Sequence, residues 1–411
     1  MTDLPDLPPY DPTSAESLAD PFPEYARRRA GGCPIAPVES LEVPFWTLFG
    51  YDDIRSALLA PKTFSNRYGN TPVFQKSIGF FADAPTHTHF RAIFRKRLSP
   101  ESLAALKPQV QALAERLLAD MLAKGPLVEL HDDFALPLPV KVVSILLGIP
   151  GEDYPRLKHW SDALMDNAFG KDNQAFLEVY QGVCAFFDAF LDERYATLAA
   201  AGIETPALEH IGTVLPDDWI SDAICADYMG RKLTRDEQRI ALMGLLVGGN
   251  ETTTSLITNV MWRLLERPEL WEQTKADPDR LIPVAIEESL RFDAPTLGTF
   301  RTTLCPVEVA GVEIDAKQKL MMAYGAANRD PKMFEDPETF RLDRDLKTVS
   351  RHLAFGAGSH SCPGAPLSRM EVGIVLRLFV QHMPQVALAG PAERSVGYNF
   401  WGRRSLPLCI G

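Results

Sequence analysis

One cysteine lies in a loop whose other residues favour chemistry at its sulfur. Cys362 belongs to the stretch Phe-Gly-Ala-Gly-Ser-His-Ser-Cys-Pro-Gly, residues 355–364, and a segment with helical apolar spacing follows it. The positive end of a helix dipole and its backbone N–H groups favour a thiolate. The three glycines let the backbone pass close to a large flat group. Because no second cysteine stands at CxxC spacing, one thiolate beside a flat group favours haem iron over zinc.

A second stretch combines an acid and an alcohol with two glycines. Residues 248–254 read Gly-Gly-Asn-Glu-Thr-Thr-Thr and lie inside a helical pattern that begins with the capping box Thr234–Glu237. Glycine in a helix costs about 1 kcal/mol relative to alanine. Either packing so tight that only glycine fits, or a local opening with a function, explains the pair.

Both stretches resemble the cytochrome P450 superfamily. Residues 355–364 meet every fixed position of its haem-binding pattern, Phe-Gly-x-Gly-x-His-x-Cys-x-Gly, and residues 248–253 match its central helix. The alternative for the first stretch is a buried structural cysteine in a glycine turn. The resemblance implies haem b, an iron ligand, a threonine that hydrogen-bonds to dioxygen or its water, and an acid that passes protons. The residues implied are, in that order, Cys362 with its loop neighbours Phe355, Gly356, His360 and Gly364, then Thr252, then Glu251.

Five other matched positions and one later arginine extend the resemblance. His87 and Arg91 stand four residues apart in an Asp-x-Pro-x-His context, although such a pair is usually a solvated face. With Arg301 they are implied to bind the haem propionates. The family's Glu-x-x-Arg motif, which alone is a common helical ion pair, implies a buried structural network with a later arginine, formed by Glu288, Arg291 and Arg344. One departure is Ser368, where the family usually has alanine.

The resemblance implies a mainly α fold with a small β-rich lobe, and haem between the central oxygen-binding helix and the cysteine-loop helix. It runs from about residue 20 to the end of the 411 residues. We therefore predict one domain over 21–411, preceded by an extended arm over 1–20 that contains four prolines. The formal net charge of −12 argues against nucleic acid as the main partner. The chain starts without a signal peptide, and no apolar run approaches the ~20 residues of a membrane span. The six cysteines are scattered without a framework spacing. These features predict a cytoplasmic protein with reduced thiols.

The loop over residues 66–82 is expected either to cover the substrate pocket or to be a surface loop with a few buried anchors. The resemblance adds lid residues, a segment along the haem edge and a closing β-turn that enters the pocket. These candidates are mostly aromatic and aliphatic, which predicts a small apolar substrate such as a terpenoid or an aromatic compound. Arg67 or Lys76 is an alternative anchor for a carboxylate. The predicted pocket residues are Tyr68, Phe74, Phe81, Leu164, Gly248, Thr296, Leu297 and Phe400.

The family's reaction is monooxygenation, in which one atom of dioxygen enters the substrate. We expect a monomeric bacterial enzyme of the camphor- and terpenoid-hydroxylating type. Its electrons would come from a [2Fe-2S] ferredoxin and an NAD(P)H-dependent ferredoxin reductase. A basic patch of Arg95, Lys96, Arg97 and Arg369 is predicted to meet the ferredoxin. The alternatives are a peroxide-driven haem-thiolate oxidase, a nitric oxide reductase and a non-catalytic sensor. The Glu251–Thr252 pair favours the monooxygenase, because the peroxide enzyme and the sensor need no proton delivery to dioxygen.

Overall fold

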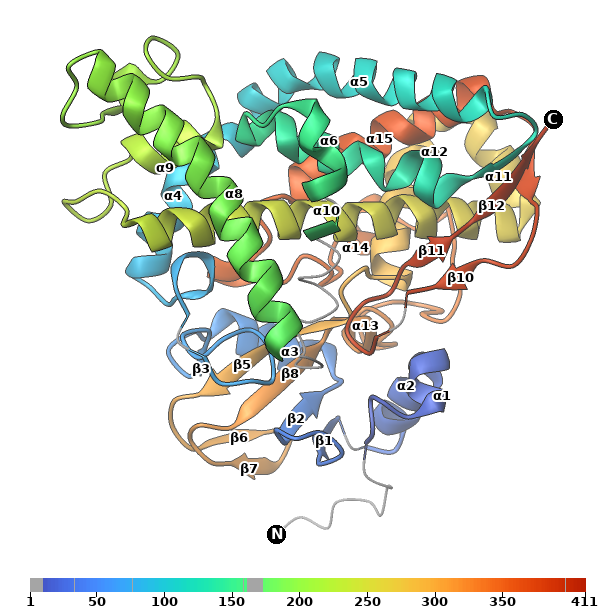
Figure 1. The fold of residues 1–411 in the computed structure, drawn as a ribbon. Helices are drawn as coiled ribbons and strands as arrows, with labels where there is room; N and C mark the ends of the chain where they lie inside the picture. Colours follow the sequence, from blue (N-terminus) through green and yellow to red (C-terminus); the bar gives the residue numbers. More distant parts are fainter. Residues whose placement is uncertain (1–9, 33, 76, 158, 161–172, 396) are drawn as a thin grey trace.

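The computed structural model describes residues 10–32, 34–75, 77–157, 159–160, 173–395 and 397–411. Helix α10 runs across the middle of the view in Figure 1. The long helices α5, α6 and α15 lie above it, and the five-stranded sheet lies below it. The helices are α1 Ala15–Ala19, α2 Phe22–Ala30, α3 Tyr51–Leu59, α4 Thr86–Arg95, α5 Pro100–Leu122, α6 Pro137–Leu147, α8 Asn173–Ala200, α9 Trp219–Cys225, α10 Arg235–Glu266, α11 Pro268–Ala276, α12 Pro278–Phe292, α13 Tyr324–Ala327, α14 Leu346–Val349 and α15 Ala365–His382.

Within the described residues the strands are short and form four small sheets. The largest has the order β1-β2-β8-β5-β3, in which only the β2–β8 pair is parallel. Strand β12 lies between β4 and β9, and two hairpins pair β6 with β7 and β10 with β11. The strands are β1 Ile35–Val38, β2 Phe45–Leu48, β3 Phe64–Ser65, β4 Leu127–Glu129, β5 Gly298–Thr303, β6 Val307–Val309, β7 Val312–Ile314, β8 Lys319–Ala323, β9 Val386–Leu388, β10 Glu393–Arg394, β11 Arg403–Ser405 and β12 Pro407–Ile410. The predicted mainly α fold with a small β-rich lobe is confirmed.

Local sequence signals explain where the central helices begin and end. Thr234 Oγ1 accepts from the backbone N–H of Glu237, whose carboxylate accepts from that of Thr234, so the predicted capping box starts α10. Gly148 ends α6 in the left-handed region, at φ +74°. A Cβ at Gly148 would also lie 2.1 Å from Asp218 Oδ2, so glycine is required there.

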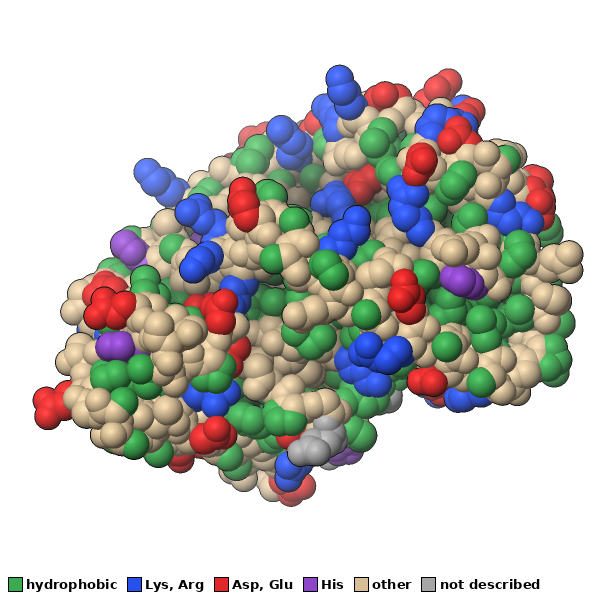
Figure 2. Space-filling view, turned by 90° about the horizontal axis from the view of Figure 1, so that it is seen from above, with side chains coloured by type: hydrophobic (Ala, Val, Ile, Leu, Met, Phe, Trp, Pro, Cys, Tyr) green, Lys and Arg blue, Asp and Glu red, His purple; other side chains and the backbone are tan. Residues whose placement is uncertain are grey.

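The largest apolar core fills the space between α5, α6, α10, α12 and α15. Two smaller clusters lie at the five-stranded sheet, one against α3 and one against α2. This packing fixes α10 and α15 against each other. Helix α10 carries residues 248–254, and the loop with Cys362 leads directly into α15. On the face seen from above, acidic and basic side chains are interspersed (Figure 2).

The predicted extended arm over 1–20 is wrong for residues 10–20, while residues 1–9 lie outside the described part. Helix α1 begins after Ser14, whose hydroxyl accepts from the backbone N–H of Ser17. Tyr10 is buried, and its ring contacts those of Tyr25 and Phe49 edge-on or nearly so. Burial of this aromatic side chain anchors the segment to the sheet lobe in spite of its prolines.

The five cysteines that the structure describes are all free thiols.

Candidate active site

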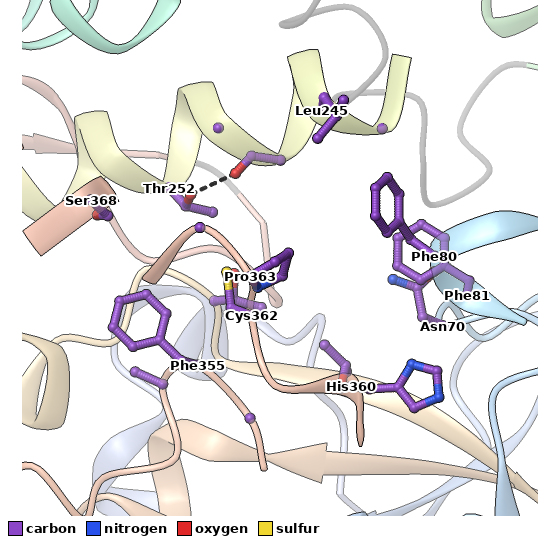
Figure 3. Close-up of a pocket in the computed structure, with 18 of the residues that line it drawn as sticks. Asn70, Phe80, Phe81, Leu245, Thr252, Phe355, His360, Cys362, Pro363 and Ser368 are labelled. Carbon is purple, nitrogen blue, oxygen red and sulfur yellow. Dashed lines mark hydrogen bonds between the residues drawn. The ribbon is translucent and has the colours of Figure 1, made fainter. Parts of the chain in front are cut away.

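A cavity of about 1450 Å³, counting its opening to solvent, lies between α10 and the loop that carries Cys362. Figure 3 shows Thr252 on α10 above this loop. Phe80, Phe81 and Asn70, which belong to the segment over residues 66–82, lie together at one side of the cavity. Strand β5 supplies Thr299 and Arg301 to the wall. The lining combines sequence segments more than 250 residues apart.

The cysteine loop is held closed by its own backbone. The Cys362 N–H donates to the Phe355 carbonyl oxygen at 2.8 Å, and the Ser361 N–H donates to the Gly358 oxygen at 3.1 Å. Gly356 and Gly358 have φ values of +66° and +70°, which non-glycine residues rarely adopt. A Cβ at Gly358 would lie 2.8 Å from the Leu58 carbonyl oxygen. The glycines therefore allow a tight loop that presents the sulfur to the cavity.

The Cys362 sulfur is accessible from the cavity but enclosed by protein in other directions. Burial raises the pKa of its thiol, while the backbone N–H groups of Gly364 and Ala365 and the Arg91 guanidinium act to lower it. The net shift is upward. The helix-terminus effect predicted from the sequence is present but is outweighed by burial in the protein alone.

Two histidines and two arginines gather at one edge of the cavity. The rings of His87 and His360 stack with centroids 3.9 Å apart. Burial lowers the pKa of both, with the charge of Arg91 adding to the effect, and that of His360 falls to about 3, so the His360 ring is neutral at pH 7. Arg91 donates to the Ser359 and Ser361 carbonyl oxygens at 3.1 and 2.6 Å, whereas Arg301 is buried and donates to the Phe300 oxygen at 2.8 Å.

Neither arginine forms an ion pair with a carboxylate in the described part of the chain. Each guanidinium has five N–H donors, and only some are used by backbone carbonyls. Two cations with spare donors at one edge suit a ligand with carboxylate groups. The structure therefore brings together the four residues predicted at the propionates or beside them.

On α10, Thr252 and Gly248 line the cavity, and the Thr252 hydroxyl donates to the Gly248 carbonyl oxygen at 3.0 Å. The hydroxyl oxygen keeps lone pairs for a hydrogen bond from the cavity. Glu251 is half-buried and is not among the lining residues; its carboxylate accepts from Ser255 Oγ at 3.5 Å. The helix is continuous from Arg235 to Glu266, so the predicted local opening does not interrupt it.

The two alternatives for the glycine pair both apply, one to each glycine. A Cβ at Gly249 would lie 2.6 Å from Val143 Cγ2 on α6, so this glycine permits close helix packing. A Cβ at Gly248 would meet nothing within 4 Å, and this glycine faces the cavity. Gly248 thus leaves room in the cavity, and Gly249 brings α10 against α6.

Alanine at these two positions should have opposite effects on stability. Gly249→Ala should destabilise the protein by about 1–3 kcal/mol, because buried Val143 is stiff at χ1 and cannot move aside freely. Gly248→Ala, the matched control, should leave stability unchanged or raise it by up to about 1 kcal/mol through helix propensity. Urea unfolding of both variants measures the difference. Equal stabilities would contradict the packing role of Gly249.

The predicted Glu-x-x-Arg network is present. Glu288 and Arg291 are both fully buried and form a two-point ion pair at 2.7 and 2.8 Å. Arg344 donates to the same carboxylate at 2.9 Å, as does the Arg341 backbone N–H. The remaining Arg291 donors bind backbone carbonyls of residues 328, 337 and 339. The network therefore ties α12 to the segment that leads toward the cysteine loop.

A second buried acid lies next to this network and was not predicted. Glu287 accepts from Arg369 at 2.6 and 2.8 Å and contacts His352 at 3.1 Å. Burial raises its pKa, but the hydrogen bonds from Arg369 and His352 outweigh burial and hold the pKa at about 2. Because the folded pKa is depressed, this stabilisation is present above about pH 4 and is lost as the pH falls toward 2.

Four predicted pocket residues do not line the cavity, and this part of the prediction is corrected. Tyr68 and Phe74 contact each other at 6.3 Å between ring centroids, and Phe74 is 47% exposed. Leu297 packs into the core beside α2. Phe400 forms a β-bridge with Thr296, so the closing turn lies against that segment and does not enter the cavity.

Phe81, Gly248 and Thr296 do line the cavity, and Leu164 lies outside the described residues. Sequence reasoning missed several lining residues on α6, α9, α10 and the loop over residues 66–82. Each of them belongs to an ordinary apolar or polar pattern without a motif. Only the tertiary packing identifies them. They include Asn66, Asn70, Val143, Trp219, Leu245 and Leu256.

The predicted basic patch is also corrected. Arg97 forms ion pairs with Asp217 and Asp222, and Arg369 binds Glu287, so neither is a free surface cation. Arg95 and Lys96 are exposed. Arg67, one of the alternative anchors, is exposed over the Tyr68 ring, and Lys76 lies outside the described residues.

The residues present suit haem b. One sulfur faces a cavity whose walls include glycine backbone on both sides, at Gly364 near the sulfur and at Gly248 on α10. Two arginines with spare donors lie at one edge. No cluster of three His, Cys, Asp or Glu residues that could hold a bare metal ion occurs among the described residues. A single cysteine sulfur facing such a cavity suits haem, which can be held by one protein thiolate.

Comparisons with known proteins agree with this site. The family model described as "Cytochrome P450" matches residues 32–384. The cytochrome P450 monooxygenase PikC of Streptomyces venezuelae is 32% identical over 91% of this chain and 87% of its own. The vitamin D(3) 25-hydroxylase of Pseudonocardia autotrophica is 30% identical over 92% and 90%.

Among solved structures, CYP109E1 of Bacillus megaterium in complex with testosterone superimposes with a TM-score of 0.84. It is 28% identical, and the match covers 97% of this chain and 100% of that one. Within the described residues, no helix is long and apolar enough to span a bilayer. The family match over most of the chain, together with the cysteine-lined cavity, shows that the protein belongs to the cytochrome P450 family and is a haem-binding monooxygenase.

Proposed function

We propose that this enzyme oxidises a small hydrophobic substrate, such as a terpenoid or aromatic compound, within the cavity under α10. Electrons are supplied to the monomer by a separate [2Fe-2S] ferredoxin and its NAD(P)H-dependent reductase. The observation that carries the proposal is the cavity itself, where Phe80, Phe81 and Leu245 stand opposite Cys362. Apolar lining with few polar groups suits an apolar ligand. Testosterone, present in the CYP109E1 complex, is a larger probe of the same chemical kind.

In this proposal Cys362 is the protein ligand of the iron, and His87, Arg91 and Arg301 hold the propionates. Haem bound through a thiolate activates dioxygen and allows one oxygen atom to enter a C–H bond. The protein residues orient the substrate, exclude water and deliver protons. Arg95 and Lys96, which are exposed at the end of α4, are the part of the predicted basic patch that remains available for an acidic ferredoxin.

Thr252 and Glu251 divide the proton delivery between them. The Thr252 hydroxyl faces the cavity with its hydrogen on the Gly248 carbonyl oxygen, so its own oxygen accepts a hydrogen bond from a proton donor there. Glu251 stands beside the cavity wall and carries protons from the outer side of α10. An acid that moves protons and an alcohol that positions them suit a site that is otherwise kept dry.

Replacing Thr252 by Ala should therefore uncouple reductant use from product formation. The variant should bind haem and substrate, but it should release hydrogen peroxide in place of most of the hydroxylated product. A loss of roughly tenfold or more in product per NAD(P)H is expected, because one positioned proton-transfer group typically contributes about 10²–10⁴-fold to a rate. The measurement is the ratio of product to reductant, with peroxide counted separately, in a system reconstituted with ferredoxin and reductase.

Glu251→Gln is the companion variant and should slow reductant consumption itself, because it removes the ionisable carrier. Thr253→Ala is the control, since Thr253 is buried, is not among the cavity-lining residues and donates to Ser368 Oγ. Wild-type coupling in Thr252→Ala would contradict the proposed role. Full activity with hydrogen peroxide alone, at the rate seen with ferredoxin, would favour the peroxide-driven alternative.

A further inference from the structure

A buried lysine in the five-stranded sheet donates hydrogen bonds to two backbone carbonyl oxygens. Lys319 is 1% exposed at the start of β8. Its Nζ donates to the carbonyl oxygens of Tyr68 and Gly69 at 2.7 and 3.0 Å, and it lies 4.9 Å from the centroid of the Phe74 ring. No carboxylate pairs with it among the described residues. Burial lowers its pKa to about 8. A lysine in such a place is retained at a cost in desolvation, which calls for a function.

The carbonyls that Lys319 binds belong to a compact loop. The Gln75 N–H also donates to the Tyr68 oxygen, at 3.2 Å, and the Ser77 N–H donates to the Arg67 oxygen at 3.0 Å. Gly69 has φ +93°, and a Cβ there would lie 2.9 Å from Gln75 Cγ. The loop therefore keeps its own shape, and Lys319 fixes it onto the sheet.

The same loop forms part of the active-site wall. The residue after Gly69 is Asn70, whose carbonyl oxygen accepts from the Phe300 N–H at 3.2 Å and whose side chain lines the cavity. Figure 3 shows Asn70 beside Phe80 and Phe81, on the side of the cavity away from Thr252. Lys319 itself does not line the cavity. Its two hydrogen bonds lie one and two residues before Asn70.

We propose that Lys319 is a positioning residue for substrate selectivity, which holds the Tyr68–Asn70 backbone against β5 and β8 so that Asn70 forms a fixed wall for bulky ligands. The inference rests on the proposed function of the cavity as the substrate site. A purely structural lysine would affect folding and haem binding alike. A positioning lysine affects large ligands and leaves the iron and small ligands unchanged.

The test uses Lys319→Met, which keeps an unbranched side chain only one atom shorter and removes its donors. Lys62→Met, an exposed lysine close to the loop, is the matched control. The probes are imidazole, which is small, and clotrimazole, which carries three bulky aryl groups on its azole. Both bind haem iron through nitrogen and shift its Soret band. Lys319→Met should weaken clotrimazole about tenfold, as expected for a lost set of wall contacts, and leave imidazole affinity and the reduced CO spectrum unchanged.

Asn70→Ala provides the test of mechanism. If Lys319 acts through Asn70, the double variant should bind clotrimazole no more weakly than Lys319→Met alone, whereas additive losses would overturn the proposal. Unchanged clotrimazole affinity in Lys319→Met, or equal losses for both azoles, would also overturn it.

Should Lys319→Met fail to fold, Gly69→Ala disturbs the same loop through the contact of its Cβ with Gln75 and the strained φ of +93°, and it should reproduce the selective loss. Unchanged clotrimazole affinity in this variant would overturn the proposal. Absence of the thiolate spectrum in the wild-type protein would instead refute the proposed function.

Discussion

Glu288→Gln is expected to destabilise the protein by about 3–5 kcal/mol, the usual cost of breaking a buried ion pair from one side. The neutral amide would leave Arg291 as a fully buried cation and would weaken the contact with Arg344. Stability measured by urea unfolding should fall by most of the margin available to a typical domain. Haem retention should fall with it, because the network anchors the segment that leads to the cysteine loop.

The chain offers a matched control in Glu272→Gln. Glu272 and Lys275 also stand three apart on a helix and pair at 2.8 Å, but Glu272 is 68% exposed. Removal of such a surface pair should cost less than about 1 kcal/mol. If the two variants lose equal stability, the buried network does not have the structural role assigned to it.

Cys362→Ser is expected to abolish product formation, because a serine hydroxyl is a poor substitute for a thiolate in donating electron density to iron. The change is nearly isosteric, and the loop bonds between the backbone of residues 355–362 do not depend on the sulfur. The protein should therefore stay folded. Cys305→Ser removes an exposed free thiol and should retain full activity. Product formation by Cys362→Ser at the wild-type rate would exclude Cys362 as the axial ligand.

The parts of the site predicted from the sequence are those encoded by short motifs. A capping box, a Glu-x-x-Arg pair and a glycine-rich cysteine loop each constrain a local geometry, and the structure has all three. The third partner, Arg344, was found only because the resemblance implied a later arginine. Glu287 carries no comparable signal, since an acid on a helix is ordinary until its partners are known.

The pocket residues could not be predicted to the same extent, because burial and direction depend on tertiary packing. Thr296 and Leu297 are adjacent, yet the first lines the cavity and the second lies in the core beside α2. Successive residues of extended chain point to opposite sides, so a shift of one residue reverses the assignment. The basic patch failed for a similar reason, since Arg97 and Arg369 meet carboxylates from distant segments.

The account depends most on the Cys362 sulfur as the ligand of haem iron. The most direct test is the absorption spectrum of the reduced, CO-bound wild-type protein reconstituted with haem b. Thiolate ligation predicts the long-wavelength Soret band that distinguishes it from nitrogen ligation, and Cys362→Ser should lose that band. A wild-type CO complex with the shorter-wavelength Soret band of histidine-ligated haem, or a long-wavelength band that persists in Cys362→Ser, would contradict the account.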